Sequence, residues 1–125
     1  MKYYITASFL LEAVSGDKNR RISIEKFLKN LIQDNHSLIT SASSVIHLLE
    51  SAGTGEVILH QLEILFDSIL PVTLNHVRSS VYLQKETTMS QLQAVETVIA
   101  MEAGSTLIDN TEAMKSQKMV KVTYF

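Results

Sequence analysis

The hydrophobic positions of the chain alternate between short continuous runs and spacings of three and four residues. Short apolar runs are typical of buried strands, whereas the longer spacing is typical of amphipathic helices. The predicted strands are Lys2–Ile5, Ser37–Thr40, Ile69–Val72, Thr106–Ile108 and Met119–Thr123. The predicted helices lie around Phe9–Val14, Ile24–Leu31, Ser41–Ser51, Val57–Phe66, Leu74–Val81 and Ser90–Ala103. This alternation predicts an α/β fold, a three-layer α/β/α sandwich around a mainly parallel sheet.

The segment from residue 90 to residue 111 carries the clearest local signals. Ser90 and Gln93 have the Ser-x-x-Gln spacing of a capping box, which begins a helix. Gly104 is expected to end that helix, and Thr106–Ile108 is typical of a parallel strand buried on both faces. Ligands of α/β sheets gather at the carboxyl ends of such strands. The polar residues expected there are Asp109, Asn110 and Thr111.

The predicted helix Val57–Phe66 is apolar nearly all round, so both of its sides must be covered. A second subunit could provide one cover, which makes Leu59, Leu62 and Phe66 candidates for a homodimer interface. The alternative is that the helix lies wedged in the core of one chain. The motif Gly53-Thr54-Gly55 before it is interpreted as a turn, because it lacks the further glycines of a phosphate-binding loop.

The composition of the chain limits the number of domains, the binding partners and the location that can be expected. A chain of 125 residues with 46% hydrophobic residues predicts a single domain, 1–125, with a full core. The formal net charge of −2 gives no broad attraction to nucleic acid or to an anionic membrane. The absence of cysteine excludes thiolate chemistry and fits a cytoplasmic location. No apolar run approaches the roughly 20 residues that cross a bilayer, and the first residues lack a signal-peptide pattern.

Four segments match, in order and spacing, the motifs of one known family. Tyr3–Leu11 resembles an opening strand with the pattern x-x-D-[TA]-[NS]-x-[LIF]-[LI]. Leu38–Leu49 resembles a strand that ends in Ser, followed by a helix that carries a Glu. Leu70–Thr73 matches a short x-L-P-[LV] strand, and Ser90–Thr111 resembles the pattern S-x-P-D-A-x-I-A-x-x-A-x-x-x-G-x-x-L-x-T-x-D. Over essentially its whole length, the chain resembles the PIN domains, which include the VapC-type toxin ribonucleases.

The resemblance implies a set of acidic positions that this chain does not fill with acids. In the family, carboxylates at the carboxyl end of the sheet hold Mg²⁺ or Mn²⁺, which activates water for cleavage of RNA. The matched positions here are Thr6, His47, Gln93 and Thr111, none of which is an anion. Neutral oxygens do not replace the lost charge, and imidazole suits zinc better than magnesium. The expectation is therefore a site without metal.

Three neighbouring acids are the candidates for a shifted metal site. Asp109 lies two residues before the matched position Thr111, and it could instead be the N-cap of a following helix. Glu50 and Glu96 each lie one helical turn beyond a matched position, and solvated carboxylates are the alternative for both.

The histidines and the basic residues give weaker evidence for a functional site. The four histidines lack zinc-ligand spacing. A basic run near the N-terminus consists of Lys18, Arg20, Arg21, Lys26 and Lys29. These residues form either a solvated helix face or a patch that contacts RNA phosphates.

Three functions remain open on this basis. The first is a catalytically degenerate PIN-like protein, a homodimeric binding or assembly module with no cofactor, whose partner could be an antitoxin-like protein. The second is a Mg²⁺- or Mn²⁺-dependent ribonuclease of VapC toxin type with a shifted acidic site. The third is RNA binding without cleavage.

Overall fold

A computed structural model describes residues 1–53 and 55–125. The strands are β1 (Lys2–Ile5), β2 (Ser37–Ser41), β3 (Ser68–Leu70), β4 (Thr106–Asp109) and β5 (Val122–Tyr124). The helices are α1 (Ala7–Ser15), α2 (Lys18–Gln33), α3 (Ala42–Ala52), α4 (Gly55–Leu65), α5 (Leu74–Lys85), α6 (Gln91–Glu102) and α7 (Glu112–Ser116).

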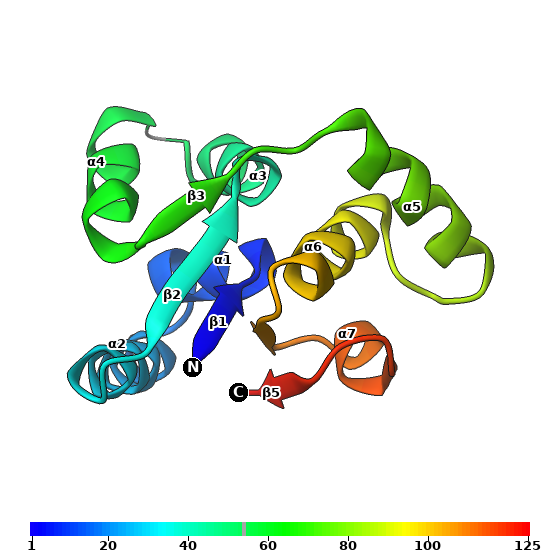
Figure 1. Ribbon diagram of the computed structural model, residues 1–125. Helices are drawn as coiled ribbons and strands as arrows, with labels where there is room; N and C mark the ends of the chain where they lie inside the picture. The colour runs from blue at the N-terminus through cyan, green and yellow to red at the C-terminus, as the bar shows by residue number, and fades with distance from the viewer. Residues whose placement is uncertain (54) are drawn as a thin grey trace.

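The five strands form one sheet in the order β3-β2-β1-β4-β5, and every neighbouring pair is parallel (Figure 1). The central strand β1 pairs with β2 on one side and with β4 on the other, Tyr4 lying opposite both Ile39 and Leu107. In a parallel sheet all carboxyl ends meet at one edge. The segments that follow β1, β2 and β4 therefore converge there.

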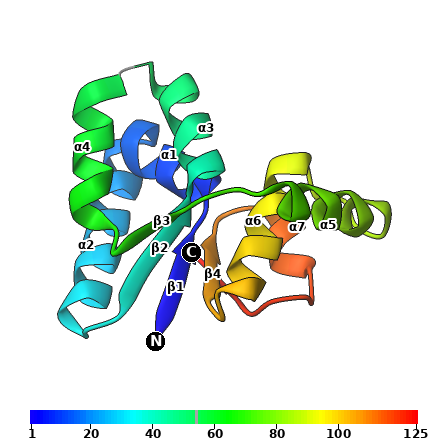
Figure 2. The same ribbon diagram turned by 45° about the horizontal axis from the view of Figure 1, so that its top comes forward.

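Helices cover both faces of the sheet, which confirms the predicted three-layer sandwich. Residues of α1 to α4 pack with Ile5, Leu38 and Ile108 on one face. Residues of α6 and α7 pack with Tyr4 and Leu107 on the other, and α5 packs on α6 (Figures 1 and 2). Adjacent strand residues thus point into different cores, because side chains of a strand alternate between faces.

The predicted signals of the α6–β4 unit are confirmed. Ser90 and Gln93 make both bonds of a capping box at the start of α6. Gly104 follows the helix with φ +65°, a left-handed conformation that glycine adopts without strain.

Two strand predictions need correction. The third strand is Ser68–Leu70 rather than Ile69–Val72, since Pro71 has no N–H with which to extend the pairing. The last strand is Val122–Tyr124 rather than Met119–Thr123. The Gln117 side chain bonds the backbone N–H groups of Met119 and Val120, which holds them in a turn.

The turn predicted at Gly53-Thr54-Gly55 is described only at its glycines, because Thr54 lies outside the described residues. Gly53 ends α3 in a left-handed conformation with φ +75°, and Gly55 begins α4. Within the described ranges, the structure has no helix of sufficient length and apolar character to span a bilayer.

The prediction that Leu59, Leu62 and Phe66 line a dimer interface is wrong for two of the three. Leu62 and Phe66 are buried in the core cluster to which residues of α1, α2 and α3 also belong. Leu59 is exposed, together with Val57 and Ile64. The alternative of a helix wedged in the core of one chain is wrong as well, since only one side of α4 is buried within the chain, and the homodimer stays a prediction.

Candidate functional site

The carboxyl edge of the sheet brings Thr6 and Asp109 side by side. Thr6 directly follows β1 and Asp109 ends β4, and the Thr6 backbone N–H bonds the Ile108 carbonyl at 3.2 Å. Both side chains are buried. The Thr6 hydroxyl donates to Asp109 Oδ1, and its own oxygen, Thr6 Oγ1, accepts from the Phe9 N–H at the start of α1. Thr6, which stands where the family has an acid, thus binds the carboxylate of Asp109 from the neighbouring strand β4.

The second Asp109 oxygen is occupied by Thr111. Asp109 Oδ2 accepts from the Thr111 N–H at 2.8 Å and from the Thr111 hydroxyl at 2.5 Å. The Gln93 side-chain amide, at the start of α6, donates in turn to the Thr111 hydroxyl at 3.2 Å. Asp109 is therefore not the helix N-cap that its spacing suggested, since Thr111 holds the N-cap position of α7.

Glu96 is the second buried acid of this edge. Its Oε2 accepts from the Ala7 N–H at 2.7 Å and from the Ser44 hydroxyl at 2.7 Å. Ser44 also contacts the Tyr4 hydroxyl at 2.7 Å, which contacts Ser41 at 2.6 Å. Because Ala7 adjoins Thr6, Glu96 and Asp109 are held by two consecutive residues of the chain.

The burial of Glu96 changes its acid–base chemistry. Loss of solvent raises the pKa of Glu96 to about 7, a rise that the bonds from Ala7 and Ser44 oppose and the charge of Asp109 reinforces. Burial and the nearby Glu96 also raise the pKa of Tyr4 well above its usual range, so its hydroxyl stays protonated. At neutral pH the pair of acids therefore carries less than two negative charges.

The structure does not bring His47 and Glu50 into this site. Both side chains are exposed on α3, which starts directly after Ser41. Ser44, in the first turn of the helix, is the residue that reaches Glu96, and His47 lies one turn further from the sheet edge. The sequence signal for Ser44 was its spacing of three residues from Ser41, which places both near the strand end.

The residues of this edge do not fit a divalent metal. Among residues 1–53 and 55–125, no group of three or more His, Asp or Glu side chains lies close enough to hold an ion. Mg²⁺ and Mn²⁺ require several charged or polar oxygens with free lone pairs. Both Asp109 oxygens and one Glu96 oxygen already accept bonds from protein donors, and Glu96 is partly protonated at neutral pH.

A second hydrogen-bonded network links the residue after β4 with α1, α2 and the C-terminal residue. The Asn110 side-chain amide donates to Glu12 Oε1 at 3.1 Å, and Arg20 Nε donates to the same oxygen at 2.7 Å. The Arg20 guanidinium also donates to the Phe125 carbonyl and lies over its ring, 4.9 Å from the ring centre. Phe125 stacks on Phe27 with ring centres 4.3 Å apart. Sequence reasoning missed this contact between α2 and the residue after β5.

The network also sets the acidity of Glu12. Partial burial alone would raise the pKa of Glu12, but the bonds from Asn110 and Arg20 and the Arg20 charge together lower it. Arg20 is therefore engaged within the chain rather than available to RNA. Of the other residues predicted as a basic patch, Lys29 pairs with Glu25 at 3.0 Å, and the rest, Lys18, Arg21 and Lys26, are exposed on α2.

Solved structures with the same architecture come from toxin–antitoxin systems. A chain of VapBC2 from Rickettsia felis, solved bound to a promoter DNA fragment, superposes with a TM-score of 0.68 at 14% identity, covering 100% of this chain and 99% of that one. The chain has a VapC-like PIN fold. A toxin–antitoxin complex from Klebsiella pneumoniae gives a TM-score of 0.69 at 16% identity, with 94% of each chain covered.

FitAcB from Neisseria gonorrhoeae gives a TM-score of 0.70 at 15% identity, covering 96% of this chain and 95% of that one. Neither a family model nor a curated protein sequence matches the chain. At these identities the likeness concerns the fold. The chemistry of the carboxyl edge must be argued from the residues present in this chain.

Proposed function

We propose that this protein is a catalytically degenerate PIN-like domain that acts as a binding or assembly module in a toxin–antitoxin-like setting. The observation that carries the proposal is the bonding of Asp109. Thr6 and Thr111, which occupy two of the family's acidic positions, use their hydroxyls to bind both oxygens of this carboxylate. A hydrogen-bonded network thereby takes the place of a metal site.

The other two matched positions differ, since Gln93 joins the network and His47 is exposed on α3. Ser44, the residue of α3 that reaches the edge, donates to Glu96, and Gln93 supports Thr111. Buried carboxylates stay charged at low cost only where donors surround them. Here the donors are hydroxyls and backbone N–H groups of the chain itself, so the network is complete without an added cation.

A shifted ribonuclease site is the second candidate, because Asp109 and Glu96 do converge at the edge. It would need to release carboxylate oxygens from their present donors and to deprotonate Glu96. RNA binding without cleavage is less favoured, since Arg20 and Lys29 of the basic run pair with carboxylates of the chain.

We propose a partner surface in the groove between α2 and α4. Two adjoining hollows of about 530 and 670 Å³ share Ile32, Gln61 and Leu65 as lining residues. Their apolar floor and the exposed side chains of Ile32 and Ile64 suit an amphipathic helix of an antitoxin-like protein. A homodimer remains a prediction, and Leu59 is the residue of its predicted interface that reaches the surface.

The activity test is cleavage of mixed RNA by the purified chain in millimolar Mg²⁺ or Mn²⁺. The expected result is no cleavage above that of an Asp109→Asn variant. Cleavage that disappears in Asp109→Asn and in Glu96→Gln, but persists in the exposed-site control Glu50→Gln, would instead establish the shifted ribonuclease site.

The partner surface is tested by co-purification with an antitoxin-like protein. Ile64→Asp, in the groove, is expected to weaken the complex, whereas Val57→Asp, exposed on the same helix but outside the groove, is expected to leave it intact. Equal recovery of the complex with both variants would place the partner elsewhere.

A further inference from the structure

The strand β5 is one edge of the sheet, and the backbone groups on its outer side have no partner among residues 1–53 and 55–125 (Figure 1). The carbonyl of Lys121 and the N–H of Phe125 bond β4, at 2.9 and 3.0 Å. Because consecutive residues of a strand direct their backbone groups to opposite sides, those of Val122 and Tyr124 face away from β4. An extended peptide can bond such groups as an added strand.

Three exposed lysines surround this edge. They are Lys115 in α7, Lys118 and Lys121, and the ion pairs within the described residues involve none of them. Glu112 is the acid of the same segment, so residues 112–125 carry a net charge of +2 in a chain whose net charge is −2. The positive charge at β5 is therefore available to a partner.

The lysines reach the edge from both faces of the sheet. Val122 packs with the core on the α6 side, so Lys121 next to it points toward the other face, because strand side chains alternate. On the α6 side, Lys115 Nζ lies 4.6 Å from the ring centre of Tyr124, a residue that is 44% exposed. A strand added to β5 would meet a positive charge beside each of its faces.

The same charges select the occupant of the edge. Two copies of β5 paired edge to edge would bring their lysines together, and like charges across a strand pair are destabilising. Lysines at an exposed edge thus oppose pairing between copies of one chain. An acidic strand would be attracted instead, since its charge is complementary.

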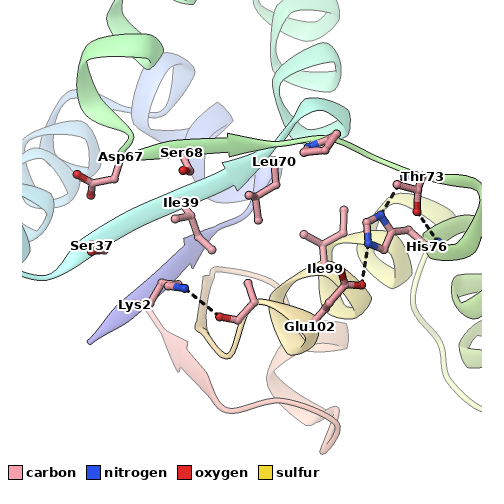
Figure 3. Close-up of a pocket in the computed structure, with 12 residues that line it drawn as sticks. Lys2, Ser37, Ile39, Asp67, Ser68, Leu70, Thr73, His76, Ile99 and Glu102 are labelled. Atoms are coloured by element: carbon pink, nitrogen blue, oxygen red, sulfur yellow. Dashed lines mark hydrogen bonds and ion pairs between the residues drawn. The ribbon is translucent and has the colours of Figure 1, made fainter.

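The opposite edge of the sheet, β3, lacks these features. Asp67 places a carboxylate directly before Ser68, the first residue of that strand (Figure 3). Pro71, directly after the strand, has no N–H to donate to a further strand. Of the two edges, β5 is the one that suits an acidic peptide.

We propose that the outer edge of β5 binds an acidic, extended segment of another protein. The segment pairs with the backbone of Val122 and Tyr124 as a sixth strand and places its carboxylates beside the three lysines. The inference goes beyond the proposed function, and it holds whether or not the domain cleaves RNA.

The test adds three capped hexapeptides to the full chain at about 50 mM salt and follows the backbone amides by NMR. Acetyl-Glu-Val-Glu-Val-Glu-Val-amide is acidic and can pair. Acetyl-Glu-Pro-Pro-Pro-Glu-Glu-amide has the same charge, but its consecutive prolines lack the N–H groups that pairing needs. Acetyl-Lys-Val-Lys-Val-Lys-Val-amide can pair but is basic.

We expect the first peptide to bind with a Kd on the order of 0.1–1 mM and the other two to bind at least about tenfold more weakly. At a peptide concentration of about ten times Kd, hydrogen exchange at the Val122 and Tyr124 amides should slow about tenfold, because the bound state holds these N–H groups in bonds.

Variants separate backbone pairing from charge. Tyr124→Pro removes an outward N–H but no bond to β4 and should weaken binding at least about tenfold, whereas Tyr124→Ala should change it by less than about threefold. Lys118→Glu combined with Lys121→Glu should weaken binding about tenfold. The matched control is Lys85→Glu, because Lys85 also lies over an exposed tyrosine, Tyr82 on α5, and this variant should bind as the native chain does.

The outcomes that contradict the proposal are distinct from failure of the proposed function. Equal binding of the three peptides, slowed exchange at amides other than Val122 and Tyr124, or no binding at millimolar peptide would overturn it. If Tyr124→Pro does not fold, the peptide series and the lysine variants decide. Ile64→Asp, in the groove between α2 and α4, should leave binding of the acidic peptide unchanged, so the two surfaces are tested separately.

Discussion

The protonation of Glu96 gives a prediction whose size follows from the structure. A carboxyl whose pKa rises from 4.5 in the unfolded chain to about 7 in the fold binds its proton more tightly when folded. Its contribution to stability is fully present below pH 4.5 and is lost as the pH rises through 7. Between pH 5 and pH 8 the titration of this single group should lower the free energy of unfolding by about 2–3 kcal/mol.

Glu96→Gln isolates that contribution. The amide oxygen of Gln can still accept from the Ala7 N–H and the Ser44 hydroxyl, while the titrating group is removed. Urea unfolding at pH 5, 6, 7 and 8 should show the variant gaining about 2–3 kcal/mol on the native protein across that range. The exposed-site control Glu50→Gln should follow the native profile. If Glu96→Gln also runs parallel to the native protein at all four pH values, the account of a neutralised buried acid is refuted.

Three further predictions concern packing, capping and the outer network. Leu62→Ala should lower the free energy of unfolding by about 2–5 kcal/mol in urea titrations, because Leu62 lies in the core, and Leu59→Ala should change it by less than about 1 kcal/mol. Ser90→Ala removes one bond of the α6 capping box and should cost about 1 kcal/mol, measured in the same way; an unchanged midpoint would mean that the cap is dispensable. Glu12→Gln should remove a small stabilisation, less than about 1 kcal/mol after solvent screening, that is present above the unfolded pKa of Glu12 and lost in acid, so native and variant stabilities should converge as the pH falls from 6 to 3.

The fold could be predicted because its signals are local and repeated. The capping box of Ser90 and Gln93, the glycine after α6 and the short apolar run of β4 each specify one element, and together they specify an α/β unit. The ends of the strands were less predictable where a side chain bonds the backbone next to the strand. Gln117, for example, holds the backbone before β5 out of the sheet.

Of the four matched positions, the structure brings three together in one hydrogen-bonded network and leaves His47 exposed on α3. Thr6, Gln93 and Thr111 do converge, since each lies next to a strand end or a helix start. Ser44 was not singled out in the sequence, and its role follows from the structure, where its hydroxyl bonds both Glu96 and the Tyr4 hydroxyl. Glu96 could have been noticed as an acid within an apolar run, but burial alone determines that it bonds Ala7 rather than solvent.

The most direct test of the central claim is titration of the native chain with Mn²⁺, with the free ion measured by electron paramagnetic resonance. The account predicts that the free-ion signal stays proportional to added Mn²⁺ up to millimolar concentrations, as it does for Asp109→Asn. The account would be contradicted if one ion bound per chain with a Kd below about 0.1 mM and this binding were lost in Asp109→Asn. Metal at a hundredfold excess over that Kd would also add about 2.7 kcal/mol to the stability of the chain. Such binding would show that the hydroxyl network yields to a cation.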